Sequence, residues 1–271
     1  MTETSPTTTS SPENPSTEPS SREDPSTETS SPPARRRLHW SFLGPSPYGP
    51  TAKFQEVLRT NLRQGRGPEH LLLLEHDPPV FTLGRNANST DVVASPEWLE
   101  RQGVEVHETN RGGQVTYHGP GQLVGYPILN LDPDRRDVRR YVRDLQEALI
   151  RTLRDFDIQA RRREGKDFIG VWVGDEKIAS IGVHLSHWIT IHGFALNVST
   201  QLDHFTGIVA CGLPQVRMTS IERSLGEAPP LAQVAHRVAS HLGEIFERDL
   251  VHREADDLRK VLESSIGPPT P

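Results

Sequence analysis

The stretch from residue 167 to residue 199, DFIGVWVGDEKIASIGVHLSHWITIHGFALNVS, carries the strongest fold signal in the chain. It contains four short apolar runs, DFIGVWV, EKIASIGVHL, HWITIHG and FALNVS, which are separated by very short breaks. The Gly174-Asp175 pair is typical of a two-residue hairpin turn. Strands joined this tightly pair antiparallel, because parallel neighbours need a long crossover. The stretch therefore predicts consecutive antiparallel strands.

Strands and helices are mixed on both sides of this stretch. LHWSF (38–42) and LLLLEH (71–76) indicate strands, with a helix over 51–64 between them. Apolar residues at helical spacing predict a helix over 137–156, and another amphipathic helix after Pro229-Pro230. The order lacks the regular strand–helix alternation of doubly wound folds. We predict an α/β fold of the α+β type, with a mixed, largely antiparallel sheet flanked by helices.

Local signals mark where several of these elements begin or break. Ser95 followed by Pro96 predicts a helix start, and Gly103 predicts its end. A capping box over residues 219–222 predicts another short helix. QLVGYPILNL (122–131) indicates a strand that Gly125 and Pro127 interrupt.

The first 34 residues differ from the rest of the chain in composition. They are almost entirely Ser, Thr, Pro and Glu, so they have almost no apolar surface to bury and we expect them to be disordered. They hold six acids and one base, so only −1 of the formal net charge of −6 is left for the remaining residues. We therefore predict a disordered tail over 1–34 and a single folded domain over 35–271.

The composition also indicates in which cellular compartment the protein works and which classes of partner it binds. The single Cys excludes an intrachain disulfide, and no apolar run reaches the roughly 18 residues of a membrane span. We expect a soluble cytoplasmic protein without membrane or nucleic-acid partners, since the body is not basic overall. Arg triplets at 35–37 and 161–163 are either solvated cations or a docking surface for an acidic partner.

The most unusual segment is NRGGQVTYHGPGQLVGYP, residues 110–127. Its Gly-Gly and Gly-Pro-Gly steps allow close backbone approach, and Arg111, Thr116, Tyr117 and His118 lie between them. Each glycine cluster alone indicates no more than a loop turn. Together they indicate a ligand-binding loop, which lacks the Gly-Lys-Ser/Thr ending of a phosphate loop.

Lysine is scarce in this chain, which has four Lys and 26 Arg. Lys177 lies in the predicted strand EKIASIGV, where alternation places it on one face with Ala179 and Ile181. It is either a hairpin-end Lys that reaches water or an amine that faces a reactive group, a role that Arg cannot take because it does not deprotonate.

Cys211, in GIVACGLP (207–214), is the only cysteine. A lone Cys is commonly a buried, inert hydrophobe. A nearby ammonium would favour its thiolate, so Cys211 and Lys177 are also a possible nucleophile–base pair. The 34 positions between them leave that pairing a hypothesis.

Four motifs together resemble those of the lipoyl(octanoyl) transferases, in the same order and over about residues 38–250. They are RGGQVTYHGPGQLVGYP, KIASIGVH, WITIHGFALNV and CGLP. The resemblance implies the fold of biotin and lipoate protein ligases and a catalytic domain over 35–271. It implies octanoyl transfer, without ATP or any other cofactor, from octanoyl-acyl carrier protein to a lysine of a lipoyl domain. The acceptors would be 2-oxoacid dehydrogenases and the glycine cleavage H protein.

The resemblance also implies residue roles. Cys211 would be the nucleophile that carries the acyl group as a thioester, and Lys177 would be its activating partner. His118 would position substrate or relay a proton. The implied substrate-binding residues are Arg111, Gly112, Gly113, Gln114, Val115, Thr116, Tyr117, His118, Ser180, Ile181, Gly182, Gly193, Phe194 and Ala195. The chain departs from the family at Ala210, where Pro is more common.

Several rival functions share some of these features. The nearest are an ATP-dependent lipoate or biotin ligase and an amidotransferase that moves octanoyl between lipoyl domains. A cysteine hydrolase and a non-catalytic module that binds acyl carrier protein are more distant. His184, His187 and His192 are close in sequence but lack a metal-ligand motif, so we expect no metal there.

Overall fold

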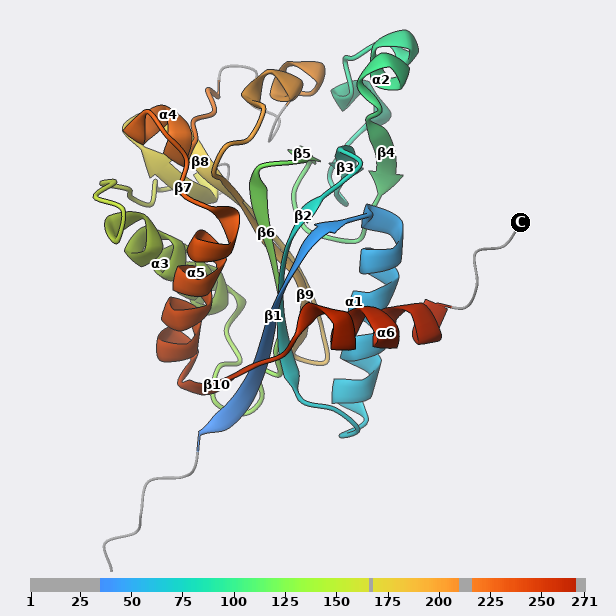
Figure 1. Ribbon diagram of the computed structural model, residues 1–271, viewed down its shortest axis with the longest axis vertical. Coiled ribbons are helices and arrows are strands. Elements are labelled where there is room, and N and C mark those ends of the chain that lie inside the picture. The colour runs from blue at the N-terminus through green and yellow to red at the C-terminus, as the bar shows by residue number, and fades with distance from the viewer. Residues whose placement is uncertain (1–34, 166–167, 210–215, 267–271) are drawn as a thin grey trace, which may run out of the picture. The chain divides into compact units, whose positions relative to one another are not determined.

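The computed structural model describes the backbone of residues 35–165, 168–209 and 216–266, and side chains in these ranges up to Val261. Residues 1–34, the predicted nucleophile Cys211 and its neighbour Ala210 lie outside the described residues. Figure 1 shows a central sheet with helices on both sides. The helices are α1 (Tyr48–Arg63), α2 (Pro96–Gln102), α3 (Val138–Arg154), α4 (Ile221–Leu225), α5 (Leu231–Phe246) and α6 (Ala255–Ile266), with 3-10 turns η1 (Ser89–Asp91) and η3 (Leu202–Gly207).

The central sheet has seven strands in the order β10-β1-β2-β6-β9-β8-β7. Their bounds are β1 Arg36–Ser46, β2 Glu69–His76, β6 Gln122–Ile128, β7 Gly170–Val173, β8 Glu176–Ser186, β9 Ile189–Asn197 and β10 Arg248–His252. Strand β1 is parallel to both neighbours, and the other neighbouring pairs are antiparallel. The predicted mixed, largely antiparallel sheet flanked by helices is confirmed.

A smaller sheet holds β4 (Glu105–Glu108), β3 (Val80–Leu83) and β5 (Val115–His118), with β3 in the middle. Its core packs Phe81 and Tyr117 against Phe205 of η3 and Trp98 of α2. This sheet matters for the site, because β5 and the loop before it belong to the glycine-bracketed segment singled out in the sequence.

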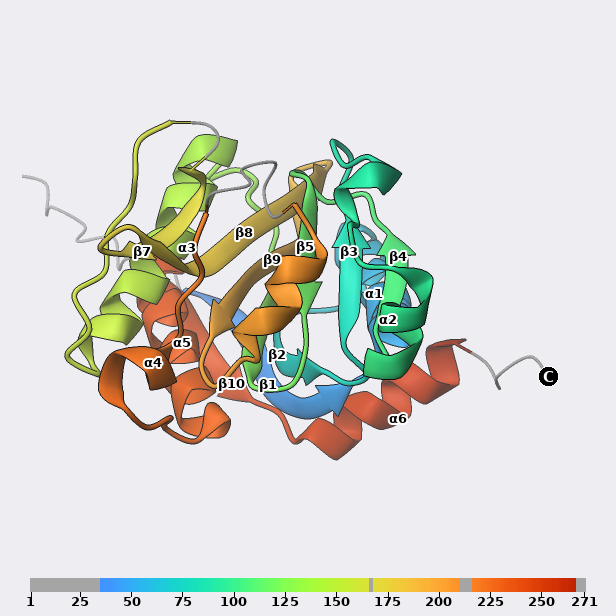
Figure 2. The same ribbon diagram turned by 90° about the horizontal axis from the view of Figure 1, so that it is seen from above.

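Each face of the central sheet has its own core. On one face, the stripe of α3 and the apolar side of α5 cover Leu71, Ala179 and Leu196. On the other, α1 and α6 cover residues such as Leu72 and Ile191. Figure 2 shows these helix pairs on opposite sides of the strands. Because both faces are covered, β2 and β9 are buried at almost every position, and the centre of β2 is the apolar run Leu71–Leu74.

Hairpin chemistry connects the middle strands as expected. Gly174 takes a positive φ of 56° in the β7–β8 turn. His187 and Trp188 take φ of 52° and 61°, the two positive values of a type I′ turn, and join β8 to β9. HWITIHG and FALNVS, expected to be separate runs, form the single strand β9, in which Gly193 pairs with Gly182.

Two other local predictions need correction. Strand β6 is not interrupted, since Gly125 pairs with Phe194 of β9 and Pro127 with Leu71 of β2. The helix start predicted at Thr219 is one residue too early: Ser220 is the N-cap and its Oγ accepts the Arg223 N–H. The reason is that Met218 forms a parallel bridge with Lys177, and the Thr219 N–H donates to the Lys177 carbonyl as part of that bridge, so it does not turn into the helix. The helix starting at Ser95 and ending at Gly103 is as predicted.

The face of Lys177 is also different from the prediction. The β7–β8 pairing joins Val171 to Ala179 but Trp172 to Lys177, so Ile178 is an extra residue on β8. Directly paired residues share a face of an antiparallel ladder, so this bulge separates Lys177 from Ala179. Lys177 therefore lies on the face of Gly170 and Ser180 rather than on that of Ala179 and Ile181.

Candidate active site

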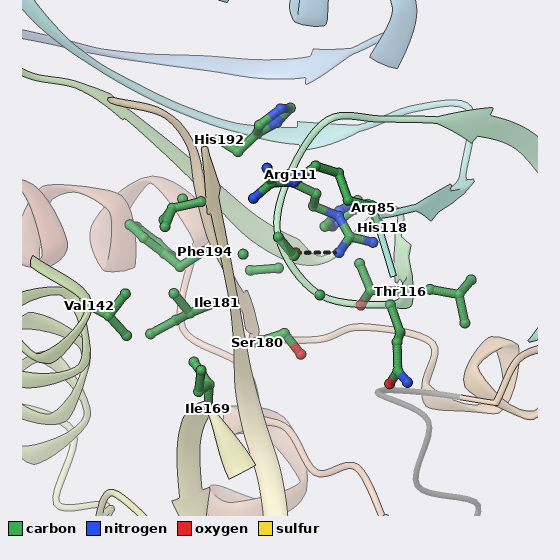
Figure 3. A pocket seen from close by; sticks show the side chains of 18 of the residues that line it. Arg85, Arg111, Thr116, His118, Val142, Ile169, Ser180, Ile181, His192 and Phe194 are labelled. Carbon is green, nitrogen blue, oxygen red and sulfur yellow. Dashed lines mark hydrogen bonds between the residues drawn. The ribbon is translucent and has the colours of Figure 1, made fainter. Parts of the chain in front are cut away.

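A cavity of about 410 Å³ lies where the glycine-bracketed loop meets β8 and β9. It is lined by every predicted substrate-binding residue except Tyr117, and by Lys177. These residues come from segments between 111 and 195, so the tertiary structure gathers them into one place. Figure 3 shows apolar side chains (Val142, Ile169, Ile181) on one side of the nearest strand and polar ones (Arg85, Arg111, Thr116, His118) on the other.

Tyr117 faces away from this cavity. Strand alternation in β5 turns its ring into the smaller core, where it is fully buried against Phe81 and Phe205. Its hydroxyl is 2.9 Å from Nδ1 of His204. The expectation that Tyr117 binds substrate therefore does not agree with its position, and the residue packs the core behind the site.

Arg111 is a fixed cation in the polar half. Its Nη2 donates to the Thr82 carbonyl at 2.6 Å, its Nε donates to the Thr82 hydroxyl at 3.2 Å, and the residue is buried. Gly84 makes room for this geometry, since a Cβ there would be 2.8 Å from Arg111 Nη1 and 2.3 Å from the Gly113 carbonyl oxygen. A guanidinium held this firmly is suited to one fixed negative or polar group.

The loop itself is docked on β8 by backbone contacts. The Gly112 N–H donates to the Val183 carbonyl at 2.9 Å. A Cβ on Gly182 would be 3.0 Å from the Gly112 carbonyl oxygen, a tight contact with backbone that glycine at this position avoids. The glycines here bring two backbones together, which is the role that their spacing indicated.

Two buried imidazoles lie in the polar half. Burial, with a further contribution from His76, lowers the pKa of His118 well below its usual value. Burial and then Arg111 lower the pKa of His192 to about 3. Both rings are therefore neutral near pH 7. His192, which the sequence analysis considered only as a metal ligand, lines the cavity, and its Nε2 is 2.7 Å from Asn110 Oδ1.

Lys177 is 2% exposed, and its Nζ is 5.7 Å from the centroid of the Trp172 ring. Gly170 provides space for it: a Cβ there would be 2.5 Å from Lys177 Cε. The Lys177 backbone also holds the strand-like segment around Met218, with its N–H donating to the Arg217 carbonyl at 2.8 Å. The part of the chain that follows residues 210–215 is thus attached beside Lys177.

The segment that precedes residues 210–215 is attached to a different element. Ile208 forms a bridge with Val92, and the Val209 N–H donates to the Asp91 carbonyl at 2.8 Å in η1.

Several lining residues were missed by the sequence analysis. The apolar half adds Val138 and Val142 of α3, Ile169 and Val183, and the polar half adds Tyr48, Arg85, Asn86, Tyr126 and His192. The only available signal was the apolar stripe of α3, which already contained Val138 and Val142. The others come from six separate elements or loops and have no shared pattern.

No helix in the described part of the chain is long and apolar enough to cross a membrane. Among the same residues, no three His, Cys, Asp or Glu side chains are grouped to hold a metal ion.

Residues 47–243 match the family of lipoyl protein ligase A/B catalytic domains. The chain is 50% identical to an octanoyltransferase of Solibacter usitatus, over 77% of this chain and 93% of that protein. It is 44% identical to one of Caldicellulosiruptor bescii, over 77% and 91%. It is 49% identical to one of Myxococcus xanthus, again over 77% of this chain but only 59% of that longer protein.

Solved structures show the same fold at low identity. A lipoate-protein ligase A bound with ATP superposes with a TM-score of 0.68 at 17% identity, over 84% of this chain and 94% of that one. A bi-partite lipoate protein ligase from Thermoplasma acidophilum superposes with a TM-score of 0.63 at 16% identity, over 84% and 92%. At these identities the likeness establishes the fold alone.

Proposed function

Because this chain belongs to the family of lipoyl protein ligase A/B catalytic domains and its activity is octanoyl transfer in protein lipoylation, we propose that the donor is octanoyl-acyl carrier protein and that the acyl group passes through a thioester on Cys211. Lys177 is the partner of that thiol in this proposal. The acceptors are lysines of lipoyl domains, in 2-oxoacid dehydrogenases and the glycine cleavage H protein.

The observation that carries the proposal is the division of the cavity. Val142, Ile169, Ile181 and Phe194 form an apolar half, and Lys177 lies in the same cavity together with the fixed cation Arg111. An octanoyl tail buried on the apolar side gains about 0.8 kcal/mol per CH₂, or roughly 5 kcal/mol in all. Its carbonyl then lies toward the polar half, where acyl chemistry can occur.

The first half-reaction transfers the acyl group to the enzyme. The Cys211 thiolate attacks the carbonyl carbon of the donor thioester, a new C–S bond forms, and the C–S bond to the carrier breaks. The leaving thiolate of the carrier takes a proton from Lys177. An ammonium near the thiol favours the thiolate beforehand and supplies this proton afterwards.

The second half-reaction releases the product. The acceptor amine attacks the Cys211 thioester, a C–N bond forms, and the C–S bond to Cys211 breaks. The proton lost by the amine returns to Lys177, which restores the starting state. No nucleotide or metal enters this scheme, and a persistent free thiol fits the reducing cytoplasm.

Intact mass spectrometry tests the nucleophile directly. The protein is incubated with octanoyl-acyl carrier protein and no acceptor, and we expect an octanoyl-sized mass increase in the wild type. Cys211→Ala should lose it, and since Cys211 is the only cysteine no other thiol can substitute. A Cys211→Ala variant that keeps the adduct, or full activity, would overturn the proposal.

Alkylation with iodoacetamide tests the role of Lys177. We expect Lys177→Ala to shift the pH midpoint of Cys211 alkylation upward, because an ammonium no longer favours the thiolate. An unchanged profile would remove Lys177 from that role. Transfer that requires ATP with free octanoate would favour a ligase reaction, and octanoyl-lipoyl domain as the only effective donor would favour an amidotransferase.

A further inference from the structure

A chain of hydrogen bonds runs from His118 in the cavity to the segment that follows residues 210–215. Nδ1 of His118 is 2.8 Å from Gln122 Oε1, and Gln122 Nε2 is 2.9 Å from Asn197 Oδ1. Asn197 Nδ2 is in turn 2.9 Å from the Thr219 carbonyl oxygen. His118, Gln122 and Asn197 are all buried, so water does not compete for these contacts.

The Thr219 end of this series of hydrogen bonds determines which group donates and which accepts in each of them. The Thr219 carbonyl can only accept, so Asn197 must present its NH₂ there and its oxygen to Gln122. Gln122 must then donate its NH₂ to Asn197 and turn its oxygen toward His118. Nδ1 of His118 must therefore carry the proton. This result follows from chemistry and does not depend on which amide atom is assigned as oxygen.

The Nδ1–H tautomer leaves Nε2 as the bare ring nitrogen of His118. Nε2 has no hydrogen-bond partner among the described residues, and His118 lines the cavity. The same half of the cavity holds the guanidinium groups of Arg85 and Arg111, which can only donate hydrogen bonds. The tautomer of His192 is not determined in this way, because its partner Asn110 has an amide that can donate or accept.

We propose that Gln122 and Asn197 are positioning residues that hold His118 in its Nδ1–H tautomer, so that the bare Nε2 accepts an N–H of the incoming lysine amine. The inference rests on the proposed function, which supplies that amine. A nitrogen that attacks a carbonyl must direct its lone pair at the carbon, and an acceptor for its N–H fixes that direction.

The same surroundings make His118 an acceptor rather than a proton store. Burial and the neighbouring His76 lower its pKa, with smaller contributions from Arg111 and His192, whereas only the Gln122 contact opposes them. The imidazolium form is therefore disfavoured, and the proton of the amine passes to another group. Of the two roles considered for His118, positioning is the one the structure favours.

The tautomer can be measured without any activity. In protein labelled with ¹⁵N-histidine, long-range ¹H–¹⁵N spectra separate a protonated ring nitrogen from a bare one, and His118→Asn identifies the signals of His118. We expect a protonated Nδ1 and a bare Nε2 in the wild type, and mixed tautomers in Gln122→Met. A protonated Nε2 in the wild type would overturn the proposal.

Kinetics then test the role of the tautomer. A carboxylate in Gln122→Glu favours the imidazolium and raises the pKa of His118, so below that pKa Nε2 carries a proton and cannot accept. We expect this variant to form the acyl-enzyme normally but to transfer octanoyl to the lipoyl domain about tenfold to a hundredfold more slowly at pH 7, with recovery as the pH rises. Gln122→Met should slow transfer without that recovery.

The chain offers a matched control for the added carboxylate. His204 contacts Gln102 at 3.3 Å, outside the cavity, so Gln102→Glu makes the same change beside a different histidine. We expect its transfer rate and pH profile to match the wild type. Equal loss of both half-reactions in Gln122→Glu with an unchanged pH profile would overturn the positioning role. Failure of the wild type to form an acyl-enzyme would instead overturn the proposed function.

Discussion

At the scale of single residues, Gly170 controls the position of Lys177. Its φ of 148° is open to glycine, and a Cβ there would be 2.4 Å from the Ala179 carbonyl oxygen and 2.5 Å from Lys177 Cε. Both contacts are closer than real Cβ atoms allow, and one of them is to rigid backbone. The amine of Lys177 therefore depends on the absence of a side chain two residues before Trp172.

We expect Gly170→Ala to lower the rate of acyl-enzyme formation at least tenfold and the free energy of unfolding by about 2–4 kcal/mol, since it combines overpacking with backbone strain. Intact-mass time courses and urea unfolding measure the two effects. Gly174→Ala is the control, because its φ is also positive but nothing lies within 4 Å of the added Cβ. Gly174→Ala should lower the free energy of unfolding by about 1 kcal/mol and leave the rate of acyl-enzyme formation unchanged. Equal effects of the two variants would contradict this account.

At the scale of elements, one helix forms the apolar wall. Val138 and Val142 are four residues apart on α3 and both line the cavity, while the rest of its stripe packs into the core. Val142 lies beside Ile181 and Ile169 in the view of Figure 3, at the end of the cavity away from Arg111. A larger side chain at this position shortens the space for an acyl tail.

We expect Val142→Phe to favour shorter acyl chains. Exclusion of two CH₂ groups is worth about 1.6 kcal/mol, or roughly fifteenfold in the hexanoyl-to-octanoyl preference. Competition between hexanoyl- and octanoyl-acyl carrier protein, read by the masses of the acyl-enzymes, measures this ratio. Val106→Phe on β4 is the control, since Val106 is exposed and outside the cavity. An unchanged ratio in Val142→Phe would argue against an acyl tail at this wall.

The same helix presents cations next to its cavity-lining stripe. Arg139 and Arg143 follow Val138 and Val142 directly, are exposed, and have no carboxylate within 4 Å among the described residues. In the triplet at 161–163, Arg161 and Arg163 are 3.8 Å from Asp175 and Arg162 is 3.6 Å from Glu147. The predicted docking role of that triplet stays untested, and internal ion pairs reduce its attraction for an acidic partner.

We expect the double charge reversal Arg139→Glu/Arg143→Glu to raise the KM for acyl carrier protein about tenfold at low salt, with a smaller change in kcat, because it repels an acidic donor from the helix that lines the cavity. Arg161→Glu/Arg162→Glu is the matched comparison. A larger rise in KM for that variant would place the docking surface at the triplet instead.

At the scale of the whole molecule, buried histidines link stability to pH. Burial lowers the pKa of His70 and of His76 to about 4, and that of His192 to about 3. Unfolded chains bind these protons near pH 6.5, so below that pH the unfolded state holds more protons than the folded state. Stability contributed by these groups is complete above pH 6.5 and is lost as the pH falls toward 4.

We expect the free energy of unfolding to fall by about 3 kcal/mol between pH 6.5 and 5.5, or about 1 kcal/mol for each of the three groups, since the unfolded imidazoles are half protonated at pH 6.5 and almost fully protonated at pH 5.5. Urea unfolding across this range measures the slope. His76→Gln should reduce the slope by up to a third, since Gln can replace the contacts to Ser46 and Tyr126 without titrating. A slope near zero in the wild type would contradict the burial of neutral imidazoles.

The whole chain is also divided by composition, with a boundary near residue 34. We propose that residues 1–34 are not part of the catalytic domain, because their composition offers almost nothing to bury. Deletion of residues 2–34 should leave the unfolding midpoint and the rate of octanoyl transfer within experimental error of the full chain. A substantial loss of either would assign the tail a part in the domain.

Some features of this protein were determined by the sequence alone, because they depend on neighbours along the chain. The hairpins of β7, β8 and β9, the stripe of α3, and the glycine-bracketed loop from Arg111 to His118 all come from local patterns and were predicted. The pairing of Cys211 with Lys177 came from residue chemistry and from the resemblance to a family, and it stays a prediction. These features are enough to predict the fold class and most of the glycine-loop, β8 and β9 residues that line the cavity.

Only the tertiary structure decided the rest, because it depends on the register of pairing and on contacts between distant segments. The bulge at Ile178 moved Lys177 to the face of Ser180, although simple alternation predicted the opposite face. Strand pairing turned Tyr117 away from the cavity, and packing brought in Tyr126, His192 and Val142. The tautomer of His118 depends on a carbonyl about a hundred residues later, at Thr219, which no local pattern can reveal.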